Sequence, residues 1–340
     1  MKIRCDICGG ELVMLAGGKG GACKVCGMEH SVERIREMIG LAATRDTDEI
    51  KPQKKEPLKK EHKAEILITD EYAPVCESTK EVLTESSDSD FVVKKRFGGT
   101  YELRGYTGNA QRVVFPAHNF EINNCSIFDG HDEIVELVIS GGYSNTGCKK
   151  GIFAGLKNLK KVVCHGDMLA FDGDFMGCEK LEEVIIDNAD LIQLNGAVFA
   201  DCTSLKSVVL DENAELEMGV ATFKNCASLK TFVHPKRSAC FTSDGINSSA
   251  FEGCTSLEKV VLADDTTSIH KYAFRDCTNL REVTTHSGDL SGIAIHPEAF
   301  SGSSFEAENA GICPKCGKKT NFSDESISCS CGFSSVQYYN

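Results

Sequence analysis

Eight of the 18 cysteines in this 340-residue chain stand in pairs whose spacing is typical of metal ligands. Near the start, two Cys-x-x-Cys motifs are separated by fourteen residues, and near the end a Cys-x-x-Cys and a Cys-x-Cys are separated by twelve. Two such pairs at this distance predict a four-thiolate zinc site. The predicted ligands are Cys5, Cys8, Cys23 and Cys26 in the first site and Cys313, Cys316, Cys329 and Cys331 in the second.

The chemistry expected of these sites is structural. Each Cys-x-x-Cys knuckle directs two sulfur atoms at one point, and the glycine that follows permits the positive φ of a tight turn. Because four cysteines fill the tetrahedral shell, no position is left for water or a substrate. We therefore expect two structural Zn2+ ions per chain. A redox role is the alternative for the N-terminal motifs, and the Cys-x-Cys pair of the second site is a shorter, tighter chelate.

Each zinc site needs a hairpin that returns its second knuckle to face the first. The glycine-rich run 17–21 suits the tip of such a hairpin, and it lacks the ending of a phosphate-binding loop. After the second knuckle, Ser31 can cap a short amphipathic helix that ends near Gly40. We therefore predict a zinc ribbon with a short C-terminal helix over residues 1–41 and a second zinc ribbon over residues 311–340.

Composition and charge bound the rest of the chain. Hydrophobic residues make up 41%, which is ordinary for a packed core, and 37 basic against 50 acidic side chains give a net charge of −13. The longest apolar run, Leu12 to Ala16, is far shorter than the ~18 residues of a membrane span. The N-terminus shows no apolar region of a secretory signal. We expect no membrane insertion, and the many thiols favour a reducing compartment, as in a cytoplasmic, bacterial-type protein.

Residues 42–90 show no sustained periodicity and are predicted to be a flexible charged linker. The segment 51–63 is basic, whereas residues 65–90 are acidic and rich in hydroxyl groups. Opposite charge blocks with few apolar residues bury too little surface to offset the entropy lost on ordering. A tether is one interpretation, and contact of the basic segment with nucleic acid or acidic lipid is the alternative.

Residues 91–310 carry a repeat of 22 to 28 residues that centres on a phenylalanine. Three positions later stands a cysteine in five copies, six positions later a leucine or isoleucine, and nine later usually a valine or leucine. A coil of this length cannot bury its own apolar face, so neighbouring coils must stack. The pattern predicts a solenoid of about eight coils with one short strand each. The repeat phenylalanines are Phe128, Phe153, Phe175, Phe199, Phe223, Phe251, Phe274 and Phe300.

The repeat motif, AFxxCxxLxxVxL, resembles the BspA-like leucine-rich repeats over roughly residues 100–305. The segment 108–116 resembles the part of that family that leads into the first repeat. The resemblance implies a leucine-rich repeat solenoid, mainly parallel β with loops and short helical turns. Members of this family are often bacterial surface or adhesive proteins. The predicted fold class is therefore a repeat solenoid with two small zinc-ribbon domains.

The repeat cysteines form a column inside the predicted solenoid. Parallel strands hold neighbouring Cβ atoms near the strand spacing of ~4.8 Å, which is wider than the ~3.8 Å of a disulfide. We therefore interpret these cysteines as small buried hydrophobic residues. The column contains Cys178, Cys202, Cys226, Cys254 and Cys277; Cys164 takes an inward strand position, and Cys76, Cys125, Cys148 and Cys240 have no assigned role.

Alternate residues of each strand point away from the core, so the solenoid presents two outward columns. One column is polar with mixed charges and runs from Arg112 to Glu282, and the other is almost entirely β-branched. Strand propensity explains the second column without any function. The functional interpretation is an exposed apolar stripe that binds a protein or peptide partner. Its residues are Val138, Val163, Ile185, Val209, Val233 and Val261.

No motif in the chain indicates an enzyme. Asp172-Gly-Asp174 lacks the rest of a calcium loop and is interpreted as a turn, and His234 as a core residue. We predict a non-enzymatic protein-interaction scaffold with structural zinc at both ends. The alternative is a nucleic-acid-associated regulator that binds through the N-terminal ribbon and basic linker. Residues 91–310, with 20 basic and 30 acidic side chains, do not favour phosphate binding.

The second ribbon follows the last degenerate coil directly in the sequence. Stacked coils leave apolar columns open at the ends of a solenoid. We therefore expect this ribbon to pack near the C-terminal end of the solenoid and to cap it.

Overall fold

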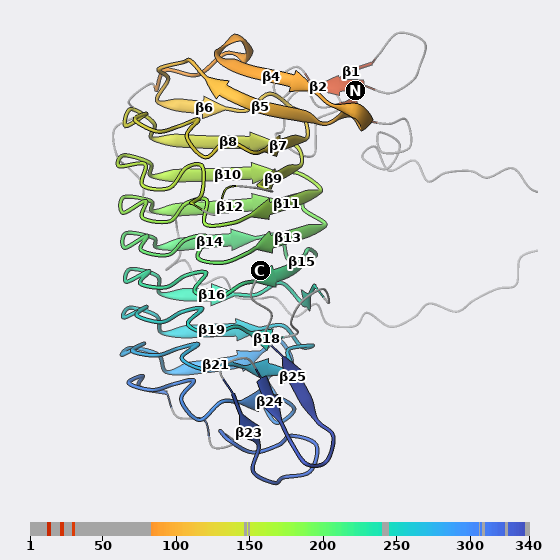
Figure 1. Cartoon of the computed structure of the whole chain (residues 1–340), viewed down its shortest axis with the longest axis vertical. Coiled ribbons are helices and arrows are strands. Elements are labelled where there is room, and N and C mark those ends of the chain that lie inside the picture. The colour runs from red at the N-terminus through yellow and green to blue at the C-terminus, as the bar shows by residue number, and fades with distance from the viewer. Residues whose placement is uncertain are drawn as a thin grey trace, which may run out of the picture. The chain divides into compact units, whose positions relative to one another are not determined.

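The computed structural model describes the chain from residue 83 to residue 336 with short gaps, and a few backbone segments before it (Figure 1). The chain divides into two compact units, Met1–Val82 and Leu83–Asn340, and each is described by itself. The described ranges are 83–145, 148, 150–239, 245–305, 307, 310–323 and 326–336, with the backbone alone at 12–14, 21–23 and 29–30.

In the first unit, three short strands form an antiparallel sheet. Leu12 pairs with Cys23, so the hairpin predicted between the two knuckles is confirmed. The predicted ligands Cys5, Cys8 and Cys26 lie outside the described residues, as do the predicted helix after the second knuckle and the linker as far as residue 82. The strands are β1 (Leu12–Met14), β2 (Gly21–Cys23) and β3 (Glu29–His30).

The second unit is a solenoid of about seven turns, most of which carry two short strands. We call the strands that hold the repeated valines A strands; they stack in parallel as one column in Figure 1. The predicted leucine-rich repeat solenoid is thus confirmed. The A strands are β6 (Arg112–Val114), β8 (Glu136–Ser140), β10 (Lys161–His165), β12 (Glu183–Asp187), β14 (Ser207–Leu210), β16 (Thr231–Val233), β19 (Lys259–Leu262) and β21 (Glu282–Thr285).

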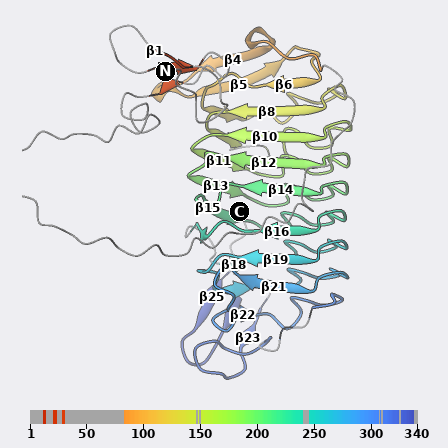
Figure 2. The ribbon, with the colours of Figure 1, turned by 180° about the vertical axis from the view of Figure 1, so that it is seen from behind.

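The second strand of each turn, here called a B strand, was not expected from the sequence. The B strands are only two to six residues long, and no residue type recurs at one position in them. Strands this short show no hydrophobic alternation that could be detected in the sequence. Their stack is visible beside the A strands, to the right in Figure 1 and to the left in Figure 2. They are β5 (Tyr101–Tyr106), β7 (Phe120–Ile122), β9 (Tyr143–Asn145), β11 (Met168–Phe171), β13 (Leu191–Leu194), β15 (Glu215–Met218), β17 (Arg237–Ser238), β18 (Gly245–Ile246), β20 (Ser268–Ile269) and β22 (Ala294–Ile295).

Both stacks of hydrogen-bonded strands are interrupted at the same level of the solenoid. The A sheet is continuous from β6 to β14 and again from β16 to β21, and the B sheet is divided between β17 and β18. The interruption falls in the longest repeat, where 28 residues separate Phe223 from Phe251. The extra length gives this turn two B strands, one for each part of the sheet.

The phenylalanine of each repeat lies in the turn between a B strand and the next A strand. From Phe153 to Phe300 the rings are stacked with centroids 5.1–5.4 Å apart and planes inclined by only 3–12°. All of these rings except the last are fully buried. The ladder therefore repeats at the spacing of the strands and fixes the register of one turn on the next.

The cysteine column links each turn to the one before it. Each Sγ donates a hydrogen bond of 3.0–3.2 Å to the carbonyl oxygen of the phenylalanine one turn earlier. Burial raises the pKa of Cys178 and of Cys277 to about 12, so these thiols keep the proton that they donate. The five repeat cysteines are free, which confirms that they are not disulfide-bonded. The repeat motif predicts buried hydrophobic residues at these positions, and it does not reveal this hydrogen bond.

A backbone requirement explains which residue stands two positions after each phenylalanine. From the second repeat on, this position has φ between 58° and 76°. Only Gly, Asn and Asp adopt this left-handed region at low cost. The residues found there are Gly155, Gly177, Asp201, Asn225, Gly253, Asp276 and Gly302.

The C-terminal ribbon packs against the last turns of the solenoid, as expected. The Phe322 ring meets His296 edge-on with centroids 4.7 Å apart, and Ser335 Oγ donates to Ser268 Oγ at 2.7 Å. The end of the phenylalanine ladder is covered by another residue, because Phe305 of the connecting segment lies 4.9 Å from Phe300. The ribbon thus packs beside the last B strands, and the connecting segment covers the apolar end.

The ladder generates a direct test of stability. Phe199→Ala should lower the free energy of unfolding by about 3–5 kcal/mol, because it leaves a cavity between two stacked rings. Phe305→Ala is the control, since Phe305 is only half-buried and has a ring on one side. Urea denaturation followed by circular dichroism should show the larger loss for Phe199→Ala; equal losses would contradict the role given to the ladder.

Candidate metal centre and partner-binding face

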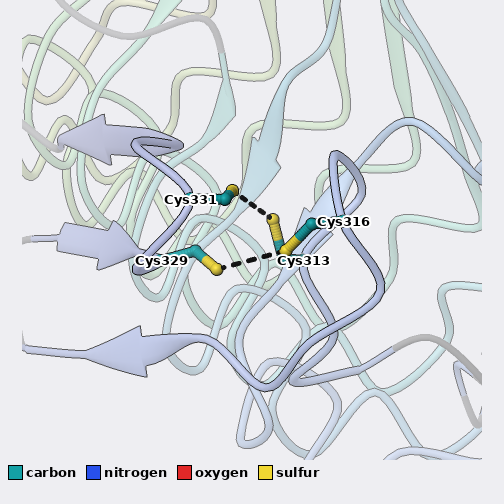
Figure 3. A group of neighbouring side chains, drawn as sticks. All are labelled: Cys313, Cys316, Cys329 and Cys331. Carbon is teal, nitrogen blue, oxygen red and sulfur yellow. Dashed lines mark hydrogen bonds between the residues drawn. The ribbon is translucent and has the colours of Figure 1, made fainter.

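The four C-terminal cysteines come from two knuckles that face each other across the ribbon (Figure 3). The first knuckle, Cys313 to Gly317, precedes β23 (Asn321–Phe322). The second, Cys329 to Gly332, lies in the turn between β24 (Ser326–Ser328) and β25 (Ser334–Val336), which pair antiparallel. The hairpin brings together residues that are more than ten positions apart in the sequence.

The sulfur atoms are arranged for tetrahedral coordination. Cys313 Sγ lies 3.7 Å from Cys331 Sγ, Cys316 Sγ lies 3.5 Å from Cys329 Sγ, and all four sulfurs lie within 4.8 Å of one another. A Zn–S bond of ~2.3 Å requires sulfur atoms about 3.8 Å apart at the corners of a regular tetrahedron. This cluster can therefore hold one metal ion with little rearrangement.

The backbone of both knuckles supports the same geometry despite the shorter Cys-x-Cys. Gly317 has φ of 70° and Gly332 has φ of 89°, as expected for the glycine after each knuckle. Each glycine N–H donates at 2.9 Å to the carbonyl oxygen of the first cysteine of its knuckle, Cys313 or Cys329. The Cys-x-Cys knuckle is one residue shorter than the Cys-x-x-Cys knuckle, but it is closed by the same kind of glycine-to-cysteine hydrogen bond.

The thiols of the cluster differ in pKa. The backbone N–H of Cys331 points at the sulfur of Cys329 and lowers the pKa of that thiol to about 6, whereas desolvation and hydrogen bonds with the other three cysteines raise the pKa of Cys316 to about 12. Cys329 is therefore a thiolate at neutral pH, and a metal ion would have to displace the proton of Cys316. Four sulfur ligands in a tetrahedron suit zinc or iron better than calcium or magnesium.

The valine column lies on the outward face of the A strands, in register from strand to strand. Val163 pairs with Ile185 and Ile185 with Val209 on one part of the sheet, and Val233 pairs with Val261 on the other. The alternating burial of β10 and β12 sets the inward valines in the core and leaves Val163 and Ile185 half-buried.

The exposure of the column is uneven. Val209 is 51% exposed and Val233 is 52% exposed, whereas Val138 is only 8% exposed. Val163, Ile185 and Val261 are intermediate. Val138 therefore adds almost nothing to the outer surface, and the exposed apolar surface centres on β14 and β16.

The polar column beside the valines neutralises its own charges. Lys161 contacts Glu183 at 2.7 Å, and Lys259 contacts Glu282 at 2.8 Å. Between these pairs, β14 and β16 carry the uncharged Ser207 and Thr231. The centre of this column is therefore neutral, although mixed charges were predicted along it; the two consecutive uncharged residues at this position of the repeat, Ser207 and Thr231, are the sequence signal for it.

The Asp172-Gly-Asp174 segment is a turn, as interpreted from the sequence. Asp174 is fully buried, and its carboxylate accepts hydrogen bonds from Asn145 Nδ2 at 2.8 Å and from the backbone N–H groups of Ile152 and Asp172 at 3.1 Å. These donors occupy the oxygens that a cation would need. Burial raises the pKa of Asp174 to about 7.

The repeats match a known family over more than half of the chain. The BspA type leucine rich repeat region matches in six copies, over residues 122–244 and 244–327. The chain belongs to this repeat family. Membership agrees with the resemblance noted in the sequence and with the stacked turns of the structure.

Several solved structures are similar to this BspA-type chain. A leucine rich repeat protein of T. pallidum is 24% identical with a TM-score of 0.43, covering 59% of this chain and 83% of that one. A leucine rich cell surface protein of Faecalibacterium prausnitzii A2-165 is 16% identical with a TM-score of 0.38; the match covers 75% of this chain and only 61% of that one. No curated protein matches significantly.

None of the helices formed by the described residues has the length and apolar character needed to cross a bilayer.

Two buried histidines predict a dependence of stability on pH. Burial lowers the pKa of His234 and of His270 to about 4. Because an unfolded histidine has a pKa near ~6.5, the neutral side chains stabilise the fold above that pH, and up to about 3 kcal/mol each is lost as the pH falls toward 4. Asp174 acts in the opposite sense, since its raised pKa costs stability as the pH rises toward 7.

The histidine contribution can be isolated with His234→Gln/His270→Gln. Urea denaturation at about pH 7 and about pH 4.5 should show a smaller loss of stability on acidification in this variant than in the native chain. The same loss in both proteins would contradict the account, and Asp174→Asn measures the opposing contribution separately.

Proposed function

We propose that this protein is a non-enzymatic interaction scaffold whose A-strand face binds a protein or peptide partner. The observation that carries the proposal is the exposure of Val209 and Val233, each slightly more than half exposed, on adjacent turns. Scattered exposed valines are ordinary on a protein surface, but these two lie on neighbouring A strands, and each pairs with a further apolar residue, Val209 with Ile185 and Val233 with Val261. A contiguous apolar stripe on a rigid sheet is suited to binding.

The charges around the stripe support this proposal. Lys161 already contacts Glu183, and Lys259 contacts Glu282. A partner that covers the stripe therefore does not have to bury an unpaired charge beside it. The phenylalanine ladder holds the strands in place, so little conformational entropy is lost on binding.

We propose zinc as the metal of the C-terminal cluster, and a structural role for it. The sulfur separations and the four-thiolate donor set support this assignment. The same chemistry is proposed for Cys5, Cys8, Cys23 and Cys26, on the basis of their spacing, which gives two zinc ions per chain. The free repeat cysteines are consistent with a reducing, cytoplasmic location.

The nucleic-acid alternative stays a prediction. It depends on the N-terminal ribbon and on the basic segment 51–63, and neither is placed by the described residues except for three short strands. Within residues 91–310, acidic side chains outnumber basic ones by 30 to 20.

The proposed face can be tested by affinity capture with the full chain as bait. Ile185→Lys/Val209→Lys should reduce recovery of a specific partner at least tenfold, because it buries two charges against apolar groups. Met168→Lys is the matched control: Met168 is 51% exposed, like Val209, but lies on β11 of the other sheet. Equal recovery with Ile185→Lys/Val209→Lys and the native chain would refute the assignment of the face.

The metal assignment can be tested by elemental analysis of the purified full chain. We expect close to two zinc ions per chain, as the two four-thiolate sets require. Cys316→Ser/Cys331→Ser should remove one of them and Cys5→Ser/Cys8→Ser the other. Zinc near zero in the native chain, or content unchanged in the variants, would contradict the assignment.

A further inference from the structure

A row of carboxylates borders the valine stripe where the A strands end. From β10 onward, six loops connect an A strand to the following B strand, and the structure describes all of them. They contain seven acidic side chains and one basic side chain, Lys236, which lies 3.8 Å from Glu212. We call this row the acidic corner: Asp167, Asp190, Asp211, Glu212, Asp264, Asp265 and Asp289.

The acidic corner lies within reach of a partner seated on the stripe. Asp211 follows Val209 by two residues, just beyond the end of β14, which places it about 7 Å farther along the chain. Its carboxylate accepts a hydrogen bond from Asn213 N at 2.9 Å. Asp187, the last residue of β12, stands in the same relation to Ile185, and Asp264 follows Val261 by three residues. The carboxylates therefore run parallel to the exposed apolar column.

The opposite edge of the stripe has a different charge. Lys206 and Lys230 precede β14 and β16 and are exposed, and Lys206 contacts Glu182 at 2.7 Å. Counted from the repeat phenylalanine, the five segments that precede β12, β14, β16, β19 and β21 contain six acidic and six basic side chains, so the excess negative charge lies at the other ends of these strands. A partner with basic side chains would be attracted to one edge only, which would fix its orientation across the strands.

We propose that the partner of this face is a cationic polypeptide segment that sets an apolar row on the valines and directs Lys or Arg side chains to the acidic corner. This inference rests on the proposed function and specifies its partner. The alkyl stems of Lys and Arg can cover apolar surface while their charged ends reach the carboxylates. An acidic segment, a nucleic acid or an anionic lipid surface would bring like charges to the same corner.

The test uses fluorescence anisotropy with the full chain and three labelled synthetic peptides of roughly ten residues. One alternates valine with lysine, one valine with glutamate, and one serine with lysine. At about 50 mM salt we expect the Val-Lys peptide to bind at least tenfold more tightly than the other two, and more weakly as salt is raised.

Two variants and a control locate the binding. Val209→Thr/Val233→Thr keeps the β-branched shape but removes apolar surface, and should weaken Val-Lys binding severalfold. Asp190→Asn/Glu212→Gln should weaken it and reduce its salt dependence. Glu179→Gln removes an exposed carboxylate from the turns on the other edge and should have no effect.

The outcomes separate this inference from the proposed function. Preferential binding of the Val-Glu peptide, lost in Val209→Thr/Val233→Thr, would keep the docking face and overturn the cationic partner. If the Ser-Lys peptide binds as tightly as the Val-Lys peptide, or if the Val209→Thr/Val233→Thr variant binds the Val-Lys peptide as tightly as the native chain does, the binding is attraction to the net negative charge alone. Either result would overturn the inference. Absence of binding by all three peptides would overturn it too, while affinity capture decides the proposed function independently.

Discussion

The stacking of one phenylalanine ring on the next determines where every other part of the solenoid lies. With centroids 5.1–5.4 Å apart and nearly parallel planes, the rings advance by one strand spacing per turn. The repeat thiols extend this constraint to the backbone, because each donates to the carbonyl group of the phenylalanine one turn earlier. Side chains three residues apart in the motif thus fix both the spacing and the register of adjacent turns.

The surface features follow from that register. Since the rings stack in register, the valines of the hydrogen-bonded A strands are aligned on each side of the interruption between β14 and β16, and the loops after the strands form the acidic corner. A shift of one residue would turn the valines inward and move the charged residues into the core. The two most exposed valines lie at the level where the hydrogen-bonded sheet is interrupted, between β14 and β16. The C-terminal ribbon depends on its own constraint, the convergence of four sulfur atoms, and joins the solenoid through Phe322 and Ser335.

The interior columns and the C-terminal cysteine cluster could be predicted because each depends on local spacing. The repeated Phe and Cys positions specify that side chains at the same position of neighbouring turns stack on each other. The two C-terminal knuckles come together as their spacing indicates. The recurrence of Gly, Asp and Asn two residues after phenylalanine is a sequence signal for the left-handed position as well. The B strands were missed because pieces such as Arg237–Ser238 and Gly245–Ile246 carry no repeated pattern. The burial of Val138 could not be predicted either, because exposure depends on neighbouring turns and not on a residue's place in the motif.

We propose that the uncharged centre of the A-strand face contacts a polypeptide partner. The most direct measurement is site-specific photocrosslinking in the native cell, with a benzophenone side chain at Ser207, between the paired charges and beside the exposed valine of β14. The same side chain at Met168, on the other sheet, is the reference. The account predicts a discrete protein adduct from position 207 and none from position 168. Adducts of equal yield from both positions, or from position 168 alone, would contradict it.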